Sequence, residues 1–330
     1  MSHLTPLETC LAQALDGIAP VAPEMVAPWE GCGHVLARDL VLPHDLPPAP
    51  EALCAGFAVA ALDLVGASGG SPVALDAPQR VAPGAAMPPG TDAVLPEEGT
   101  DTPPGLIEAI RPVTPGEGIR RAGHDGRAGA ILVAAGRRLA PRHGLIAARA
   151  GIDALPLRRP RVAVALEDAE QAGFARGWLA TLGAVECAGA ADLTLRPVQD
   201  HAPRLALAPA QTAWLSPEDG TRGLVLEVPA RFDAMVAALL GLALPALAHL
   251  GGAVPGAETR PLARKLTATV GLSELVLLAE SDDGWLAQPA GLVTLSGLAA
   301  ARGFAILPPE SEGLPAGAAL SATPLDLPFG

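Results

Sequence analysis

Lysine is almost absent from this chain. Lys265 is the single lysine among 330 residues, and arginine supplies the rest of the 22 cations. Charged residues make up only 17% of the chain, and its formal net charge is −13. We expect no nucleic-acid partner for a chain with this acidic excess, because polyanions are bound by clustered Lys and Arg.

Paired cysteines and export signals are also lacking. The four cysteines lie apart, without a C-x-x-C motif, at Cys10, Cys32, Cys54 and Cys187. We interpret them as reduced thiols of a cytoplasmic protein. The N-terminus has neither a basic region nor an apolar core, so no signal peptide is predicted.

No apolar run is long enough to predict a membrane span. The longest run, Ala234 to Ala248, is shorter than the ~18 residues that indicate a spanning helix, and Pro245 interrupts it. We therefore predict a buried helix there and no membrane partner.

One segment reverses the acidic balance. Residues 111–161 hold eleven arginines against Glu117, Asp125 and Asp153, a local excess of about eight positive charges. Because salt screens charges beyond about 8 to 10 Å, this local excess decides what binds nearby. The segment is a candidate anion site, although solvated surface arginines would give the same composition.

The basic segment also contains an ordered series of motifs. RRAGHD (residues 120–125) is followed by GAILVAAG (129–136) and LAPRHGLIAARAG (139–151). Upstream lie GHVLA (33–37), LPHDLPP (42–48) and APGAAMPPGTDAVLPE (82–97). This order resembles the molybdopterin molybdenumtransferases, the MoeA family, called the gephyrin E-domain in animals. Three ordered matches are far more specific than one short motif.

Composition shifts and the resemblance predict a mixed α/β, multidomain, elongated protein, because 330 residues exceed what one core usually organises. A connecting domain is expected from residues 1–44 and 127–159, with a small β-rich inserted domain at 45–126. A shortened α/β open-sheet domain, similar to the molybdopterin-binding domain, is expected at 160–253, and a β-barrel-like domain at 254–330. Within these we predict a helix over residues 3 to 17, a strand from Phe57 to Leu64, and a strand-helix-strand unit beginning at Arg161.

The resemblance implies that the protein binds molybdopterin or its adenylate and exchanges molybdate onto it. Such chemistry needs donors for anions and carboxylates for catalysis. Asp125 and Glu170 are the expected catalytic carboxylates. The expected substrate-binding residues are Arg120, Arg121, His124, Gly84, Asp92, Arg264 and Lys265. We predict no metal ligands, and a requirement for Mg²⁺, which prefers carboxylate oxygens, stays open. For residues 123–126 a simple β-turn is the alternative interpretation.

Several family motifs are altered. Ala55 stands where the family has the Asp of S-A-M-D-G-Y-A-V, and a methyl group cannot coordinate a metal. After the first strand, Glu170 is the one matching carboxylate of S-x-G-D-E-L. The family's glycine-rich S-G-G-V-S-x-G turn is replaced by RPVQDHAP (196–203), which has no glycine to form a phosphate cradle.

These losses leave three functional hypotheses. The first is a MoeA-like protein of molybdenum cofactor biosynthesis or handling whose molybdenum-insertion activity is reduced or lost. The second is an active molybdopterin molybdenumtransferase, so the sequence leaves open whether the chain is an enzyme. The third is a chaperone or scaffold for a molybdoenzyme, which would then be a partner. An anion-binding protein outside this pathway is a weaker alternative. The resemblance also implies a homodimer.

Overall fold

The structure, a computed structural model, describes residues 4–199, 204–218, 220 and 223–325. Contacts along the chain divide it into two compact units. Unit 1 comprises Met1–Arg38, Ala134–Ile146 and Ile152–Gly330, and unit 2 comprises Asp39–Val133 and Ala147–Gly151.

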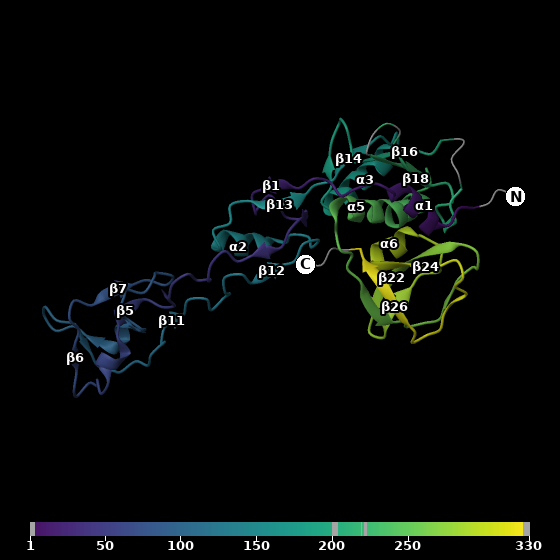
Figure 1. The fold of residues 1–330 in the computed structure, drawn as a ribbon. Coiled ribbons are helices and arrows are strands. Elements are labelled where there is room, and N and C mark those ends of the chain that lie inside the picture. Colours follow the sequence, from purple (N-terminus) through teal and green to yellow (C-terminus); the bar gives the residue numbers. More distant parts are fainter. Residues whose placement is uncertain (1–3, 200–203, 219, 221–222, 326–330) are drawn as a thin grey trace. The chain divides into compact units, whose positions relative to one another are not determined.

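A five-stranded sheet forms one layer of unit 1 (Figure 1). Its order is β15-β14-β16-β19-β18, with β18 antiparallel and the other strands parallel. The strands are β14 (Arg161–Val164), β15 (Val185–Glu186), β16 (Leu193–Pro197), β18 (Trp214–Pro217) and β19 (Leu224–Val228). Apolar residues such as Leu193, Leu195 and Leu226 alternate along these strands and are fully buried, so one face of the sheet enters the core.

Helices cover that face of the sheet. They are α1 (Leu7–Leu15), α3 (Ala169–Thr181), α4 (Phe232–Ala238) and α5 (Leu244–Gly251). The helix α2 (Pro141–Arg149) does not contribute to this core. The predicted strand-helix-strand unit is present as β14, α3 and β16, with β15 as an additional short strand. Asp168 begins α3 as its N-cap, since its carboxylate accepts the N–H of Gln171 at 2.8 Å.

The helix predicted from the apolar run is longer than the run itself. α4, a π-helical turn (Leu239–Ala243) and α5 form one helix from Phe232 to Gly251, 20 residues long. It continues past Pro245, and the π-helical turn lies directly before this proline, with the N–H of Leu244 donating to Leu239 O five residues back. By length and composition this helix passes the test for a membrane span, but 78% of its most apolar window is buried inside the fold, as in a core helix.

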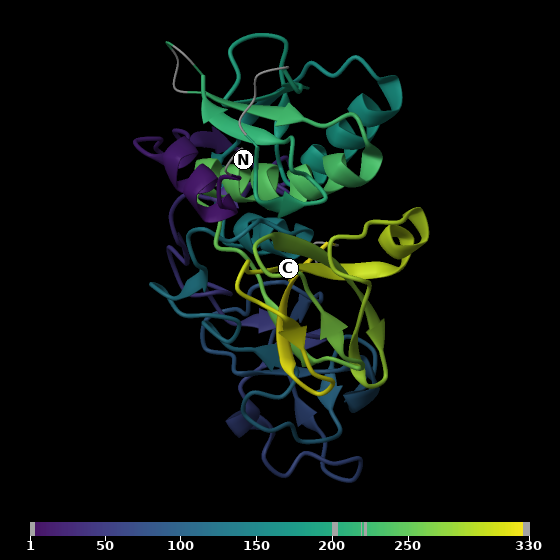
Figure 2. The same ribbon diagram turned by 90° about the vertical axis from the view of Figure 1, so that its right-hand side faces the viewer.

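The C-terminal part of unit 1 is a second sheet, in the order β17-β22-β24-β26-β20 with β23 paired to β22. Its strands are β17 (Leu207–Ala208), β20 (Glu258–Pro261), β22 (Ser273–Ser281), β23 (Gly284–Ala287), β24 (Ala301–Leu307) and β26 (Ala319–Pro324). A short pair, β21 (Leu266–Thr267) and β25 (Gly313–Leu314), and the helix α6 (Leu295–Ala300) complete it. Leu275, Leu277 and Phe304 share one apolar core with the long helix, which lies between the two sheets in Figures 1 and 2.

A three-stranded sheet, β1-β13-β2, completes unit 1 with β1 (Glu24–Val26), β2 (Val35–Leu36) and β13 (Leu155–Arg158). Beside it the backbones of Gly33 and Gly183 cross closely: a Cβ added to Gly183 would stand 2.2 Å from the Gly33 carbonyl oxygen. The ring of His34 hydrogen-bonds the Gly183 carbonyl through Nδ1 at 2.9 Å, and Arg138 donates to Gly33 O at 3.0 Å and to Leu182 O. These bonds tie the connecting segments to the open sheet.

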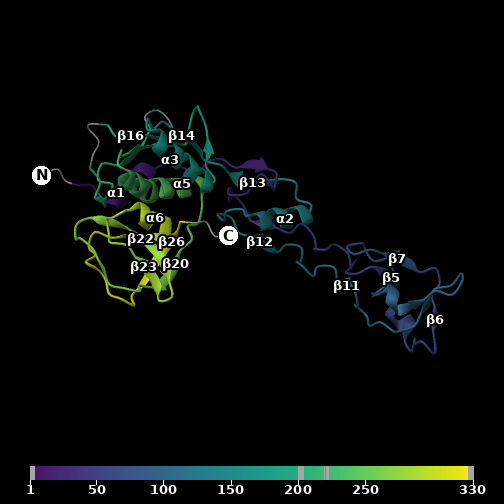
Figure 3. The same ribbon diagram turned by 180° about the vertical axis from the view of Figure 1, so that it is seen from behind.

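Unit 2 consists of short strands and turns (Figure 3). Two small sheets, β7-β5-β8 and β6-β10-β9, enclose a core that contains Phe57, Leu64 and Leu95. Two strand pairs, β4-β11 and β12-β3, carry the chain into and out of this core. The strands are β3 (Leu40–Val41), β4 (Glu51–Ala52), β5 (Gly56–Val59), β6 (Val73–Ala74), β7 (Gln79–Val81), β8 (Ala93–Leu95), β9 (Thr100–Asp101), β10 (Glu108–Ala109), β11 (Ile119–Arg120) and β12 (Ile131–Val133), and the 3-10 helices are η1 (Ala61–Leu64) and η2 (Glu97–Gly99).

The mixed α/β content predicted from the sequence is confirmed, whereas two predicted elements are shorter than expected. The first helix covers Leu7–Leu15, and Leu4 lies outside it with 37% of its surface exposed. The strand predicted from Phe57 to Leu64 ends at Val59, and η1 follows. The carboxylate of Asp92 accepts the N–H of Ala61 at 2.7 Å, which caps the start of η1 and ends the strand. The barrel-like form of the last domain and the four-domain division stay predictions.

Two buried histidines predict a pH-dependent stability. Burial is the main cause that lowers the pKa of His34 and of His143 below the usual 6.5. Nδ1 of His143 accepts the N–H of Ala140 at 3.0 Å at the start of α2, an acceptor that protonation at this nitrogen removes. A histidine whose pKa is depressed by folding binds its proton more tightly when unfolded, so stability is full above about pH 6.5 and is lost as the pH falls toward the lower, folded-state pKa.

We expect His34→Asn and His143→Asn to flatten the fall in unfolding free energy between about pH 7 and pH 5, measured by urea unfolding. His124→Asn, at an exposed position, is the matched control and should keep the wild-type dependence. If the unfolding free energies of wild type and all three variants fell in parallel with pH, the two buried histidines would not be the origin of the pH dependence.

Candidate anion-binding site

The RRAGHD motif forms a turn in unit 2 that begins in β11. Gly123 adopts φ +68°, and a Cβ there would stand 2.8 Å from Cδ of Arg127 and 2.9 Å from Oδ2 of Asp45. Only glycine meets both conditions, because other residues rarely adopt this φ and the space is already filled. The glycine of the motif is therefore required by the geometry of the turn.

The LPHDLPP motif folds directly against this turn. The N–H of Leu46 donates to Gly126 O at 2.9 Å, the N–H of Asp125 donates to Leu46 O at 2.8 Å, and the N–H of Gly123 donates to Pro47 O at 2.9 Å. Asp45 accepts from the N–H of Ala128 at 2.9 Å and from Arg127 at 3.0 Å. The Ala128 N–H is the main cause that lowers the pKa of Asp45. Two motifs about 80 residues apart in the chain thus build one site.

Arg120 is already bound by two carboxylates of the same unit. Its Nη1 lies 3.1 Å from Asp125 Oδ2 and 3.5 Å from Glu51 Oε1. The second oxygen of Glu51 lies 3.7 Å from Arg149, and the Glu51 side chain is only 14% exposed. Two guanidiniums and two carboxylates form a network without net charge, which weakens the attraction of Arg120 for an external anion.

Sequence reasoning missed Glu51. The feature that identifies Glu51 as a partner of Arg120 is the antiparallel pairing of β4 with β11, which places the two residues directly opposite each other. Opposite charges at such cross-strand positions interact. The pairing joins residues far apart in sequence, so no local motif pointed to it.

Arg121 and His124 lie on the same turn and are exposed. Within the part of the chain that the structure describes, neither side chain has an ion pair or hydrogen bond. The guanidinium of Arg121 lies close to the backbone of Gly116, where an added Cβ would stand 3.1 Å from Nη2. Arg121 is therefore the cation of this turn that an anion can reach without displacing a carboxylate.

Gly84 and Asp92 belong to unit 2 as well. Gly84 adopts φ +81° in a turn. Its backbone N–H donates to the carbonyl oxygen of Ala52, the residue that follows Glu51, at 2.7 Å. The side chain of Asp92 caps η1, and its carbonyl accepts from the N–H of Gly116 at 2.7 Å. The structure thus gives Asp92 a definite role in holding the backbone around the Arg121 turn.

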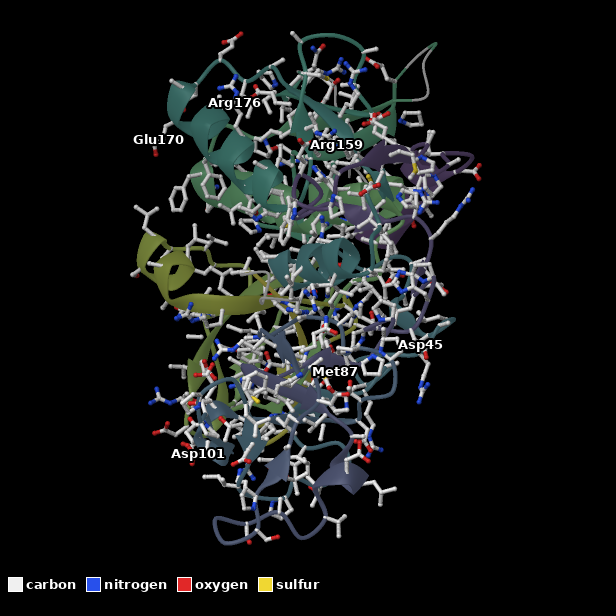
Figure 4. The ribbon with its side chains drawn as sticks, turned by 90° about the vertical axis from the view of Figure 1, so that its left-hand side faces the viewer. Asp45, Met87, Asp101, Arg159, Glu170 and Arg176 are labelled. Carbon is white, nitrogen blue, oxygen red and sulfur yellow. The ribbon has the colours of Figure 1, made fainter. Side chains whose placement is uncertain are left out.

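The remaining predicted residues belong to unit 1. Glu170 lies in the first turn of α3, and its side chain extends outward into solvent (Figure 4). Arg264 and Lys265 are exposed between β20 and β21. Asp125 and Glu170, the two predicted catalytic carboxylates, are thus in different units.

The described side chains form no metal-ligand cluster of their own, whereas Mg²⁺ is usually held by one or two carboxylates together with a substrate phosphate. Over the described ranges, no three His, Cys, Asp or Glu residues lie together as metal ligands. Ala55 is exposed before β5 and provides no ligand, and the carboxylates of Glu51 and Asp125 share a guanidinium. No catalytic step is therefore derived through a metal.

The fold of the chain is similar to that of two solved structures. It resembles the molybdopterin biosynthesis MoeA protein of Pyrococcus horikoshii, with a TM-score of 0.71 and 20% identity over 98% of this chain and 100% of that one. A molybdenum cofactor biosynthesis protein of Pyrococcus furiosus has a TM-score of 0.61 and 16% identity, covering 98% of this chain and 100% of its own. At these identities the likeness concerns the fold alone.

Sequence comparisons match part of the chain to the MoeA family. Residues 5–151 match the MoeA N-terminal region, domains I and II. A molybdopterin molybdenumtransferase of Synechococcus elongatus is 31% identical over 176 residues, 48% of this chain and 43% of the relative. Molybdopterin molybdenumtransferase 2 of Mycobacterium tuberculosis is 34% identical over 151 residues, 40% and 37% of the two chains. The matches support the MoeA family for this chain and confirm the resemblance, although they span less than half the length of these relatives.

Proposed function

We propose that this chain is a MoeA-like protein of molybdenum cofactor biosynthesis or handling, which binds molybdopterin or its adenylate and has reduced or lost molybdenum-insertion activity. The observation that carries the proposal is the turn of residues 120–128, where motifs matching the family come together around an exposed arginine. The names of the relatives support the pathway.

The ligand's phosphate is the group that this turn can attract. Arg121 and His124 present donors on an exposed surface, and Asp45 holds the backbone of the same turn by accepting the N–H of Ala128. A preformed turn binds at lower entropic cost than one that must order itself. Phosphate is recognised by guanidinium through charge-assisted hydrogen bonds.

Reduced insertion activity is the second part of the proposal. Ala55 replaces a carboxylate, and the segment after β16 has no glycine for a phosphate cradle; its residues 200–203 lie outside the described part of the chain. The loss of one group that stabilises a transition state typically costs about 2.7 to 4 kcal/mol. The alternative, an active transferase, rests on Asp125 and Glu170 as the remaining carboxylates.

We expect Arg120→Ala with Arg121→Ala to weaken molybdopterin binding at least about tenfold in calorimetric titrations, because charged hydrogen bonds contribute about 1.5 to 3 kcal/mol each. Arg121→Ala alone should account for most of the loss, since Arg120 is neutralised by Asp125 and Glu51. Arg80→Ala is the control: Arg80 is in unit 2, pairs with Glu97 at 2.7 Å and is 69% exposed. Equal affinities for wild type and the double variant would assign these arginines to surface solvation.

The chain should not restore molybdoenzyme activity in cells that lack their own molybdenumtransferase, grown at ordinary molybdate. The reason is the missing carboxylate at Ala55. An active relative is the positive control, and Ala55→Asp tests whether this single loss accounts for the defect. Restoration by the wild-type chain would instead favour the active transferase.

We further propose a symmetric homodimer, with a molybdoenzyme as an additional partner if the chain serves as a chaperone or scaffold. Large apolar side chains such as Met25, Leu62 and Leu295 are 68%, 81% and 70% exposed, which favours association. Light scattering at micromolar concentration should give twice the mass of one chain. A monomeric mass would contradict the dimer.

A further inference from the structure

The carboxyl ends of the parallel strands in unit 1 are where an open α/β sheet would be expected to bind an anionic ligand. Backbone N–H groups and helix N-termini at such an edge ordinarily point at the ligand's phosphate. In this chain β14 ends at Val164, β16 at Pro197 and β19 at Val228. At each of the three ends, among the described residues, a carboxylate of the chain itself accepts a backbone N–H.

Glu227 provides the central observation. It lies one residue before the end of β19, opposite Arg196 of β16, and is 7% exposed. Its Oε1 accepts from Arg196 Nη2 at 2.9 Å, and its Oε2 accepts from the backbone N–H of Gln199 at 3.4 Å. A buried carboxylate thus occupies both the cation and a loop donor that an external phosphate would need.

The neighbouring strand ends repeat this arrangement. After β19, Asp233 accepts from Arg231 Nη2 at 2.5 Å and from the N–H of Ala234 at 2.8 Å, with its side chain only 13% exposed. After β14, Asp168 accepts the N–H of Gln171 at the start of α3. The side chain of Gln171 in turn donates to Ala230 O, which ties the first strand end to the segment after β19.

The charge at this edge opposes an anion as well. The described residues at the three strand ends include five carboxylates, a formal excess of three over the two guanidiniums; they are Glu167, Asp168, Glu170, Glu227 and Asp233 against Arg196 and Arg231. Glu227 and Asp233 are paired with the two guanidiniums, so the excess comes from Glu167, Asp168 and Glu170. These three side chains are exposed, and solvent and salt screen part of their repulsion of a phosphate.

We infer that Glu227 is an internal anion that takes the place of a ligand phosphate at Arg196 and the Gln199 amide, so that, over the described residues, this part of the sheet's carboxyl edge is closed to anionic ligands. The inference goes beyond the proposed function, because it concerns unit 1 and stands whether or not the turn of Arg121 binds a pterin. It requires that any phosphate held by this protein be held away from this edge. Removing the Glu227 carboxylate should open the edge by freeing Arg196 and the Gln199 amide together.

The test is a titration of the full chain with inorganic phosphate, followed through the backbone amide resonance of Gln199. This local signal excludes phosphate bound at the basic segment of unit 2. In the wild type we expect no saturable shift at millimolar phosphate. In Glu227→Ala we expect saturable binding, at least about tenfold tighter than in the wild type.

Three variants complete the experiment. Glu227→Gln keeps the side-chain volume and should show a smaller gain, which covers the case in which Glu227→Ala does not fold. Arg196→Ala with Glu227→Ala should lose the gain, because the freed guanidinium is gone. Glu186→Ala is the matched control: it frees Arg176 of α3 from its 2.7 Å ion pair with Glu186 of β15 but leaves the Glu227 contacts intact, so Gln199 should not respond. Saturable binding at Gln199 in the wild type, or folded Glu227 variants without any gain, would overturn the inference.

Discussion

Neutralisation of arginine by carboxylates of the same chain is the interaction that governs both candidate sites. In unit 2, Arg120 is held by Asp125 and Glu51, and in unit 1, Arg196 is held by Glu227. Each of these pairs brings together residues that lie on different strands or on a strand and a turn. The number of arginines in a segment therefore says little about how many can meet a ligand, because an ion pair must be broken before the cation is available.

The contrast between the two units follows from this interaction. The turn of residues 120–128 keeps one exposed arginine without a carboxylate partner among the described residues, and its backbone is fixed by Asp45. At the sheet edge of unit 1, Arg196 and Arg231 are each paired with a carboxylate, and the N–H groups of Gln199 and Ala234 are bound by the same carboxylates. The geometry favours anion binding in unit 2 and opposes it at that edge.

The motifs that match the MoeA family have two kinds of role, which the sequence does not separate. Gly123 and Asp45 are needed by the turn itself, since one has no room for a Cβ and the other accepts a backbone N–H. Asp92 likewise caps η1. Residues of this kind keep the fold whether or not catalysis persists. The motif matches are therefore strong support for the fold and weaker support for the reaction.

The sequence by itself determined the mixed α/β content, the strand-helix-strand unit from Arg161, the buried helix around Ala234 to Ala248 and the resemblance to the MoeA family. These features depend on local periodicity and ordered motifs. Only the tertiary structure revealed Glu51 beside Arg120 and Glu227 beside Arg196, because strand pairing brings together residues 69 and 31 positions apart. It also decided that η1 replaces the end of a predicted strand, because the carboxylate that caps η1 comes from Asp92, 31 residues farther along the chain. Charge partners and caps of this kind depend on distances in space, which a linear pattern does not contain.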